Sequence, residues 1–256
     1  MSDPVRDRWA AGEVALNAWS TLGGASAASV LAAAGFDAVT VDLQHGEQTL
    51  ERLGEVLGEI ERAGAVPFVR LGWNDPAGAM RVLDLGARGV ICPMVDTAGD
   101  AAAFVRFCRY PPLGARSYGP VRSAFGTGRE QAHAANAAIL AFAQIETAAG
   151  WANVEAICAT PGLDGVYVGP ADLSLALGFE GFADLASNDL LEALDRVVAA
   201  ASVHGVVPGI HAPSIERAVE MARRGFRFVG AAGDRELLRG GAAESIERTR
   251  ASARTS

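Results

Sequence analysis

The chain has 256 residues, half of them hydrophobic, and carries a formal net charge of −8. The acidic balance and the lack of a basic cluster argue against a nucleic-acid partner. No apolar run approaches the roughly 20 residues that span a membrane, so we expect no membrane partner. All 22 basic residues are arginines, and the absence of lysine excludes both a Schiff-base enzyme and a Walker-type phosphate loop.

The cysteines and the first residues bear on the compartment. Cys92, Cys108 and Cys158 are odd in number and widely spaced, which fits neither a disulfide framework nor a zinc motif. We interpret them as small core residues. Residues 1–9 are charged and lack the apolar stretch of a secretion signal. We therefore expect a cytoplasmic protein.

Eight short apolar runs predict strands that are buried on both faces. They are Val14–Trp19, Ala38–Leu43, Val66–Leu71, Gly89–Met94, Ile139–Glu146, Gly165–Gly169, Val206–Ile210 and Phe226–Gly230. Helical patterns lie between them, as where Leu50, Leu53, Leu57 and Ile60 share one face. Alternation of strands and helices implies parallel strands, and eight such units in about 250 residues close as a barrel. The sequence predicts an α/β fold, a (β/α)₈ TIM barrel, as a single domain over residues 1–256.

An insertion and the last two helices complete the predicted fold. The segment Arg109–Asn136 is rich in Gly, Pro and Arg, and we expect an inserted loop with a short helix there. Pro213 suits the first turn of a helix and Gly225 suits its end. Asp234 is expected to cap a last helix that runs from Arg235 to about Ala251.

Four polar residues follow strand ends, where the active sites of such barrels lie. They are His45, Arg70, Glu146 and Asp172. The first two are 25 positions apart and the last two are 26 apart, which is about one strand–helix unit. Each pair should therefore come from neighbouring strands.

The two carboxylates suggest a metal site. Glu146 and Asp172 would repel each other in a partly buried site unless a cation or a proton lay between them. Oxygen ligands favour Mg²⁺ or Mn²⁺ over zinc, and Gly169 would let the backbone approach a ligand closely. The alternative is structural: Asp172 would cap a helical turn and Glu146 would pair with an arginine.

The other two residues suggest a base and an anion-binding group. His45 lies in a polar loop three residues after Asp42, an arrangement typical of a general base. Arg70 needs an anionic partner, which a 2-oxo acid or its enolate would provide. The alternative partner is a structural ion pair with Asp42 or Asp84. His211 ends the seventh strand and could also touch a substrate.

Five motifs together resemble a known family. They are VDLQHG (41–46), PFVRLGWND (67–75), RYPPLGARSYG (109–119), QIET (144–147) and VYVGPADLSLALG (166–178). They resemble the class II pyruvate aldolases typified by 4-hydroxy-2-oxoheptanedioate aldolase, which include 2-keto-3-deoxy-sugar-acid aldolases and have citrate lyase β-type proteins as distant relatives. The resemblance extends from about Asn17 to Gly230.

The resemblance implies a divalent-metal-dependent aldolase. Such an enzyme cleaves or forms 4-hydroxy-2-oxo acids, from pyruvate or hydroxypyruvate and an aldehyde, through an enolate. Its fold is a TIM barrel, often with the last helix exchanged between subunits of a hexamer, so we expect a homo-oligomer (hexamer or trimer). Glu146 and Asp172 would bind Mg²⁺, Mn²⁺ or Co²⁺.

The resemblance also assigns roles around the metal. Gln144 and the backbone of Ala171 would position the 2-oxo acid, and Arg70 would stabilise the enolate oxygen. His45 would act as the base, with Asp42 or Asp84 raising its basicity. Trp19 would line the aldehyde side.

Two departures from the family pattern concern the aldehyde rather than the 2-oxo acid. Many relatives carry Glu where this chain has Gln44, and we expect an apolar residue where it has His211. Two other functions remain open. A citrate-lyase-like or malyl-CoA-type lyase would need arginines such as Arg116 and Arg122 for the adenosine phosphates. A non-catalytic 2-oxo-acid-binding barrel is disfavoured by the intact set of site residues.

Overall fold

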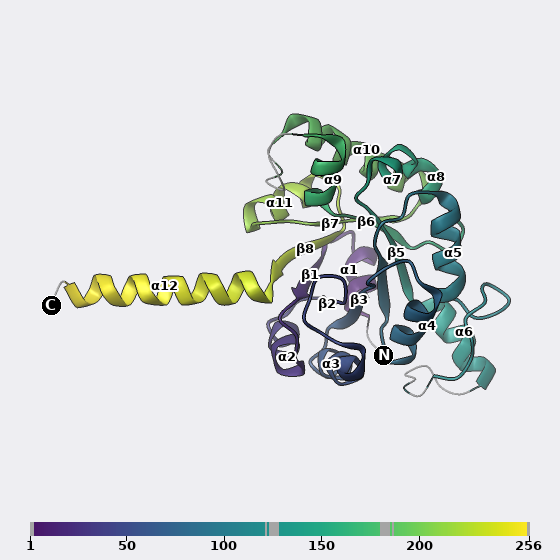
Figure 1. Ribbon diagram of the computed structural model, residues 1–256, viewed down its shortest axis with the longest axis horizontal. Coiled ribbons are helices and arrows are strands. Elements are labelled where there is room, and N and C mark those ends of the chain that lie inside the picture. The colour runs from purple at the N-terminus through teal and green to yellow at the C-terminus, as the bar shows by residue number, and fades with distance from the viewer. Residues whose placement is uncertain (1–2, 121, 123–127, 180–184, 186, 255–256) are drawn as a thin grey trace.

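The centre of the molecule is a closed barrel of parallel strands, which pair in chain order with β8 returning to β1. We use a computed structural model, in which the structure is described for residues 3–120, 122, 128–179, 185 and 187–254. The eight strands found there are β1 (Ala15–Ser20), β2 (Ala38–Asp42), β3 (Val66–Arg70), β4 (Gly89–Cys92), β5 (Leu140–Ile145), β6 (Gly165–Val168), β7 (Val207–His211) and β8 (Phe228–Gly233) (Figure 1). Each predicted strand is present, with ends displaced by at most three residues, which confirms the TIM barrel.

Helices cover the outside of the barrel. They are α2 (Ala25–Ala33), α3 (Leu50–Arg62), α4 (Pro76–Asp84), α5 (Ala98–Cys108), α6 (Gly128–Ala138), α7 (Ala148–Ala152), α8 (Val154–Cys158), α9 (Pro170–Leu177), α10 (Asn188–His204) and α11 (Ile215–Arg224). In α3 the predicted apolar stripe is buried at Leu53, Leu57 and Ile60, whereas Leu50 is 41% exposed at the helix start. Burial of such stripes against the strands holds the helical layer to the barrel.

Aromatic rings fill the interior of the barrel. Phe68, Phe142 and Phe228 pack with ring centroids 4.8–6.0 Å apart. A Cβ atom on Gly89 would lie 2.2 Å from the ring of Phe68, and one on Gly165 would lie 2.3 Å from the ring of Phe142. These strand glycines therefore leave the space that the rings occupy, and the interior is a packed core.

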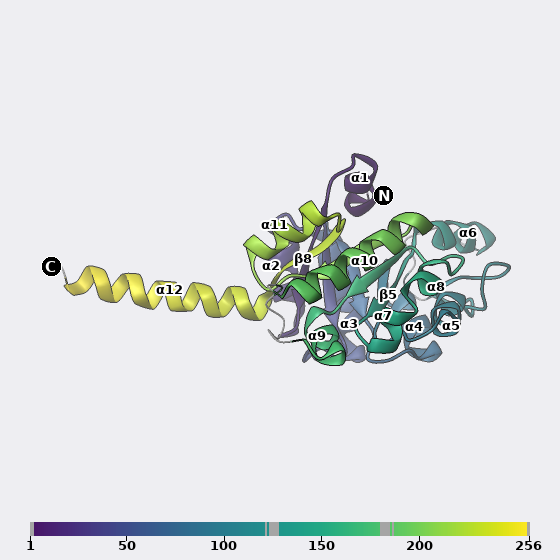
Figure 2. The same cartoon turned by 90° about the horizontal axis from the view of Figure 1, so that it is seen from above.

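The N-terminal helix α1 (Pro4–Ala10) lies across the N-terminal end of the barrel (Figure 2). Val5 is fully buried there. Trp9 packs 6.2 Å from Phe142 and from Phe228, and its Nε1 donates a hydrogen bond of 2.8 Å to the carbonyl of Arg227. With this end covered, the open end of the barrel is the one where the strands terminate.

Helix α12 (Asp234–Arg254) extends away from the barrel as a projecting arm. Residues 235–253 are all exposed, including Leu237, Leu238 and Ile246. The helix begins within one residue of the prediction, but Asp234 is its first residue and binds a distant loop. Its carboxylate accepts hydrogen bonds of 2.8–3.0 Å from the amide and hydroxyl of Thr21 and from the amide of Leu22. The root of the arm is therefore tied to the loop after β1.

The remaining local predictions have mixed outcomes. Gly225 ends α11 with φ 112°, as expected, but Pro213 precedes the helix, whose N-cap is Ser214. The predicted insertion contains α6, although residues 121 and 123–127 lie outside the described part of the chain. Among the helices of the described residues, none combines the length and apolarity that crossing a membrane requires.

Candidate active site

A pocket of about 330 Å³ lies at the C-terminal ends of the strands. Its lining comes from six strand ends, from the loops after them, and from the first turns of α9 and α12. The lining residues are Trp19, Thr21, Asp42, His45, Arg70, Gln144, Tyr167, Gly169, Pro170, Ala171, Asp172, His211, Pro213, Arg235 and Glu236. Of the predicted site residues, only Glu146 and Asp84 are not on this surface.

Arg70 and Asp42 form a two-point ion pair at the ends of β3 and β2, which are neighbours in the sheet. The Nε and Nη2 atoms of Arg70 donate to the two oxygens of Asp42 at 2.9 and 2.6 Å. Asp42 is almost fully buried. Burial alone would raise its pKa, but the hydrogen bonds and charge of Arg70 outweigh burial and hold the pKa below its usual value. Asp42 is therefore an anion that fixes the guanidinium.

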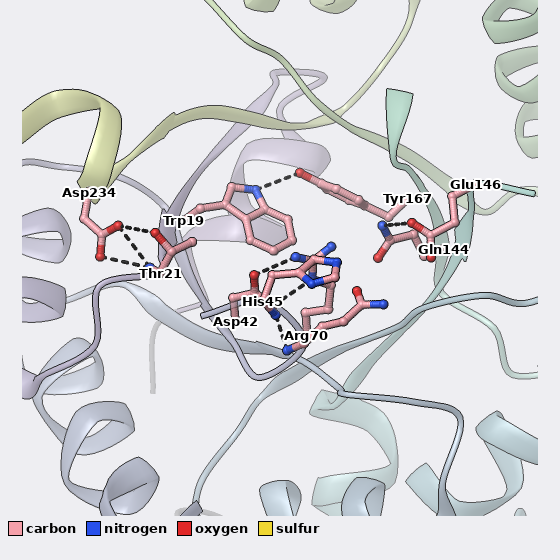
Figure 3. A network of polar contacts seen from close by, with 10 residues as sticks. Trp19, Thr21, Asp42, His45, Arg70, Gln144, Glu146, Tyr167 and Asp234 are labelled. Carbon is pink, nitrogen blue, oxygen red and sulfur yellow. Dashed lines mark hydrogen bonds and ion pairs between the residues drawn. The ribbon is translucent and has the colours of Figure 1, made fainter. Parts of the chain in front are cut away.

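His45 lies beside this pair on the loop after β2 (Figure 3). Its side chain is exposed and lines the pocket. Asp42 accepts hydrogen bonds from the backbone amides of Gln44 and His45, at 3.0 and 3.3 Å. The sequence placed Asp42 against the imidazole. In the structure, Asp42 instead supports the loop that carries the imidazole.

Asp84 lies outside the group formed by Asp42, Arg70 and His45. It ends α4 and accepts a hydrogen bond of 2.7 Å from Nη2 of Arg116. Arg116 is itself buried and lies 4.5 Å from the ring centroid of Tyr110. Asp84 therefore has a partner away from the pocket. Of the two carboxylates considered as structural partners of Arg70, Asp42 is the one that binds it.

Glu146 lies at the end of β5, directly behind the pocket surface. It is 3% exposed. Its Oε1 accepts from the amide of Met94 at 2.8 Å, and its Oε2 accepts from Nε2 of Gln144 at 2.6 Å. Burial, and in second place the charge of Asp172, raise the pKa of this carboxyl despite those bonds. Glu146 is thus a buried acid whose anion has no cationic hydrogen-bond partner among the described residues.

Asp172 faces the same pocket from α9. It is the third residue of that helix and is exposed. Gly169 is the N-cap of this helix, without a side-chain capping bond. The alternative prediction, that Asp172 caps the helix, is therefore wrong. No three His, Cys, Asp or Glu side chains gather as a metal-binding group within the described residues. A cation here would have two carboxylates from the protein and would take its other ligands from water or substrate.

Gly169 keeps the carboxylate accessible. A Cβ atom at this position would lie 2.8 Å from Oε2 of Glu146 and 2.9 Å from Nε2 of Gln144. Oε1 of Gln144 is buried and makes no hydrogen bond to a described residue. Any larger residue at position 169 would cover the oxygen-rich cradle formed by Gln144 and Glu146. The sequence prediction that Gly169 permits a close approach therefore has a specific physical reason here.

Tyr167 and the root of α12 are site elements that the sequence reasoning missed. The hydroxyl of Tyr167 accepts a hydrogen bond of 3.1 Å from Nε1 of Trp19. Tyr167 sits in the middle of β6 and is fully buried, and burial raises the pKa of its hydroxyl. Its place among the apolar residues of VYV could have indicated an inward-pointing polar group. Arg235 and Glu236 come shortly after β8, as Asp172 comes after β6. This position after a strand is the sequence signal that could have identified them as pocket residues.

Trp19 joins the two sides of the pocket. The guanidinium carbon of Arg70 lies 4.7 Å from its ring centroid, a cation–π distance. The ring of His211 meets it edge-on at 5.8 Å. Burial and the charge of Arg70 lower the pKa of His211, which favours its neutral imidazole.

Comparison with known proteins agrees with this geometry. A family model described as HpcH/HpaI aldolase/citrate lyase matches residues 16–240. A hydroxypyruvate/pyruvate aldolase from Rhizorhabdus wittichii is 37% identical, covering 96% of this chain and 98% of the relative. A 4-hydroxy-2-oxovalerate aldolase from Rhodococcus jostii is 39% identical, covering 90% of this chain and 89% of the relative.

Solved structures give the same answer. The crystal structure of an HpcH/HpaI aldolase/citrate lyase family protein from Burkholderia cenocepacia J2315 superimposes with a TM-score of 0.89 at 32% identity, covering 97% of this chain and 100% of the other. An HpcH/HpaI aldolase from Desulfitobacterium hafniense has a TM-score of 0.87 at 28% identity, covering 96% of each chain. The chain therefore belongs to the HpcH/HpaI aldolase/citrate lyase family and is a carbon–carbon lyase.

Proposed function

We propose that the protein is a divalent-metal-dependent class II aldolase, which cleaves 4-hydroxy-2-oxo acids to pyruvate or hydroxypyruvate and an aldehyde, and also catalyses the reverse reaction. One observation carries the proposal: Asp172 and Arg70 line one pocket, with the buried Glu146 directly behind Gly169 of its lining, in a chain that has no lysine. Without a Schiff base, the electron pair at C3 of the 2-oxo acid needs other groups to stabilise it. The names of the relatives support the same class of substrate.

Glu146 and Asp172 are the residues that would hold the cation, which we propose to be Mg²⁺, Mn²⁺ or Co²⁺. Three observations fit such a group: the raised pKa of the buried Glu146, the unpartnered Oε1 of Gln144, and the space that Gly169 leaves in front of both. Oxygen donors suit hard divalent cations. When bound, the cation would supply Lewis-acid polarisation of the 2-oxo acid.

Arg70 stabilises the negative charge that develops on the keto oxygen. Asp42 occupies Nε and Nη2, whereas Nη1 makes no hydrogen bond to a described residue, and the side chain lines the pocket. A guanidinium held this firmly needs little reorganisation when the charge appears, which is the main advantage of preorganised electrostatics. Gln144 and the amide of Ala171, in the first turn of α9, would position the substrate carboxylate.

His45 would move the proton between the substrate and solvent. In the cleavage direction it would accept the proton of the 4-hydroxyl, and in the synthetic direction it would accept a C3 proton, directly or through a water molecule. We assign its support to Asp42, which holds the backbone of residues 44 and 45. Asp84 has no such role in this proposal because its carboxylate is bound to Arg116.

The active assembly would be a homo-oligomer, a trimer or a hexamer in which α12 packs on another subunit. The support is that residues 235–253 are exposed and that Leu237, Leu238 and Ile246 are at least half exposed. Packing against other parts of a protein, rather than helix propensity, supplies most of the stability of a helix. We also propose that residues 1–256 act as one domain and that the protein is cytoplasmic, in keeping with three free, buried thiols.

The citrate-lyase-like and malyl-CoA alternatives have less support. Of the two arginines considered for the adenosine phosphates, Arg116 is paired with Asp84, and Nη1 of Arg122 donates to the carbonyl of Gly54. Both therefore have structural partners. The non-catalytic alternative differs in one observable: such a barrel would bind pyruvate but would not exchange its C3 protons.

That difference provides the test. The protein is incubated with pyruvate and Mn²⁺ in D₂O, and the methyl resonance of pyruvate is followed by NMR. We expect its loss at a rate proportional to enzyme concentration, and condensation when an aldehyde is added. Binding of pyruvate without loss of the resonance would refute the proposed function.

A further inference from the structure

The pocket has two walls, and the proposed function uses only one of them. The first, which we call the oxo-acid wall, consists of Gln144, Gly169 and Asp172, with Glu146 behind it. The second, the acceptor wall, consists of Trp19, His211, Arg235 and Glu236. Arg70 and His45 lie between them. The resemblance places Trp19 of the acceptor wall on the aldehyde side, but the role of the His211 imidazole beside it is not assigned.

One edge of the His211 imidazole is enclosed by its neighbours. A Cβ atom on Gly230 would lie 2.5 Å from the hydroxyl of Tyr167, 2.7 Å from Nε1 of Trp19 and 3.2 Å from Nδ1 of His211. These three polar atoms therefore gather above Gly230. Nδ1 of His211 is buried there and makes no hydrogen bond to a described residue. Since the Nδ1 edge of a pocket-lining ring is buried, the opposite edge, with Nε2, faces the pocket.

We propose that Nε2 of His211 binds the hydroxyl group of a short α-hydroxyaldehyde, and that this contact selects the acceptor of the aldol reaction. This inference rests on the proposed function and names the class of aldehyde that it left open. A neutral imidazole can donate to or accept from a hydroxyl group. An aldehyde with a methyl group in that place would displace water from Nε2 without forming a hydrogen bond to it. A site with an unpaired polar group of this kind binds such an aldehyde more weakly than the hydroxyaldehyde.

The charges on the acceptor wall favour a neutral acceptor over an anionic one. Nε of Arg235 donates to Glu236 at 2.9 Å, so the two side chains offset each other. Both are substantially exposed, which further weakens their field. A carboxylate on the aldehyde would gain little from Arg235 and would meet Glu236. A hydroxyl group carries no charge and so avoids the repulsion from Glu236.

The size of the pocket favours a short acceptor. Its volume of about 330 Å³ lies near the lower end of the roughly 300–1,000 Å³ that small-molecule pockets span. Pyruvate takes up part of this space, so the remainder suits a short aldehyde better than a long-chain one.

Glycolaldehyde and propanal make the test sharp, because they have the same size and differ by a hydroxyl in place of a methyl group. We would measure kcat/KM for each with saturating pyruvate and Mn²⁺, and take the ratio. For the unaltered protein we expect glycolaldehyde to be preferred about tenfold or more. His211→Leu should remove that preference, and His211→Gln, whose amide reaches about as far as Nε2, should keep most of it.

His204→Leu is the control, because His204 is an exposed residue at the end of α10, outside the pocket. It should leave the ratio unchanged. His211→Met is measured in parallel, so that one poorly folded variant does not decide the result. A ratio that stays within twofold of the unaltered protein in the folded apolar variants would overturn this inference, as would an initial ratio near one. Absence of pyruvate C3 exchange in the unaltered protein would instead overturn the proposed function, and this inference with it.

Discussion

The two walls of the pocket are built differently. On the oxo-acid wall, Glu146 is buried, is bonded to Met94 and Gln144, and is separated from the pocket only by a glycine. On the acceptor wall, Arg235 and Glu236 are exposed and belong to a helix that touches the barrel only at its root. The first wall is a buried, hydrogen-bonded group, whereas the second combines Trp19 and His211 of the barrel with exposed side chains of α12. Variants on the first wall should therefore affect the chemistry, and variants on the second should affect the choice of aldehyde.

The largest loss is expected for Glu146→Gln. This change removes the buried negative charge while keeping the size of the side chain, so we expect pyruvate C3 exchange to fall by about 10³-fold. Glu192→Gln, an exposed acid on α10, is the matched control and should have no effect. Exchange within threefold of normal in Glu146→Gln would show that the oxo-acid wall is misassigned.

Arg70→Lys should have the next largest effect. The ammonium group of lysine cannot bond both oxygens of Asp42 and still present a fixed donor to the keto oxygen. We expect about a 10²-fold loss of C3 exchange, carried mainly by kcat. An effect confined to KM would indicate that Arg70 binds the ground state and does not stabilise the enolate.

Asp42→Asn tests the support beneath both walls. The variant leaves Arg70 with a weaker partner and should lower the free energy of unfolding at pH 7 by about 1–3 kcal/mol. The pKa of Asp42 is depressed in the folded protein, so its contribution is present above the unfolded pKa and is lost as the pH falls through the folded pKa.

Urea unfolding at pH 7 and at a series of pH values below 3.8, the reference pKa of Asp42, would check this. The difference between the unaltered protein and Asp42→Asn should shrink with acidification. Asp189→Asn, at an exposed site on α10, should cost far less at every pH. A difference that is constant across this range would mean that the ion pair does not contribute through its charge.

The smallest effect on the chemistry is expected from the arm. Leu238→Asp combined with Ile246→Asp places charges on the exposed apolar positions of α12, and light scattering should then report a smaller assembly. C3 exchange should persist, while KM for the aldehyde should rise severalfold because the root of α12 forms part of the acceptor wall. Unchanged mass in the variant would mean that α12 does not hold the subunits together.

The contrast between the walls also explains what the sequence could predict. Strand ends and rim residues such as Glu146 and Asp172 follow from local periodicity, because parallel strands of a barrel end on one face. The prediction for Arg70 left two partners open, since spacing cannot decide between Asp42 and Asp84. The deciding fact is the pairing of β2 with β3, together with a loop that gives Asp84 to Arg116.

On the acceptor side, the sequence predicts Trp19 and His211 as pocket residues, but not the long-range contacts around them. Asp234 was expected to cap α12, a local role, but it bonds Thr21 far away in the chain. Tyr167 lies within a run that predicts a buried strand, and its hydroxyl accepts a hydrogen bond from Trp19 in a different strand. Such contacts depend on how distant segments dock, and neither periodicity nor spacing contains that information.

Metal dependence is the central claim, and chelation tests it most directly. The protein is treated with EDTA and dialysed, and C3 deuterium exchange of pyruvate is measured before and after addition of Mn²⁺, Mg²⁺ or Co²⁺. We predict that exchange disappears in chelator and returns with at least one of these ions, whereas Glu146→Gln does not recover. Full exchange in the chelated protein would contradict the assignment of Glu146 and Asp172 as metal ligands.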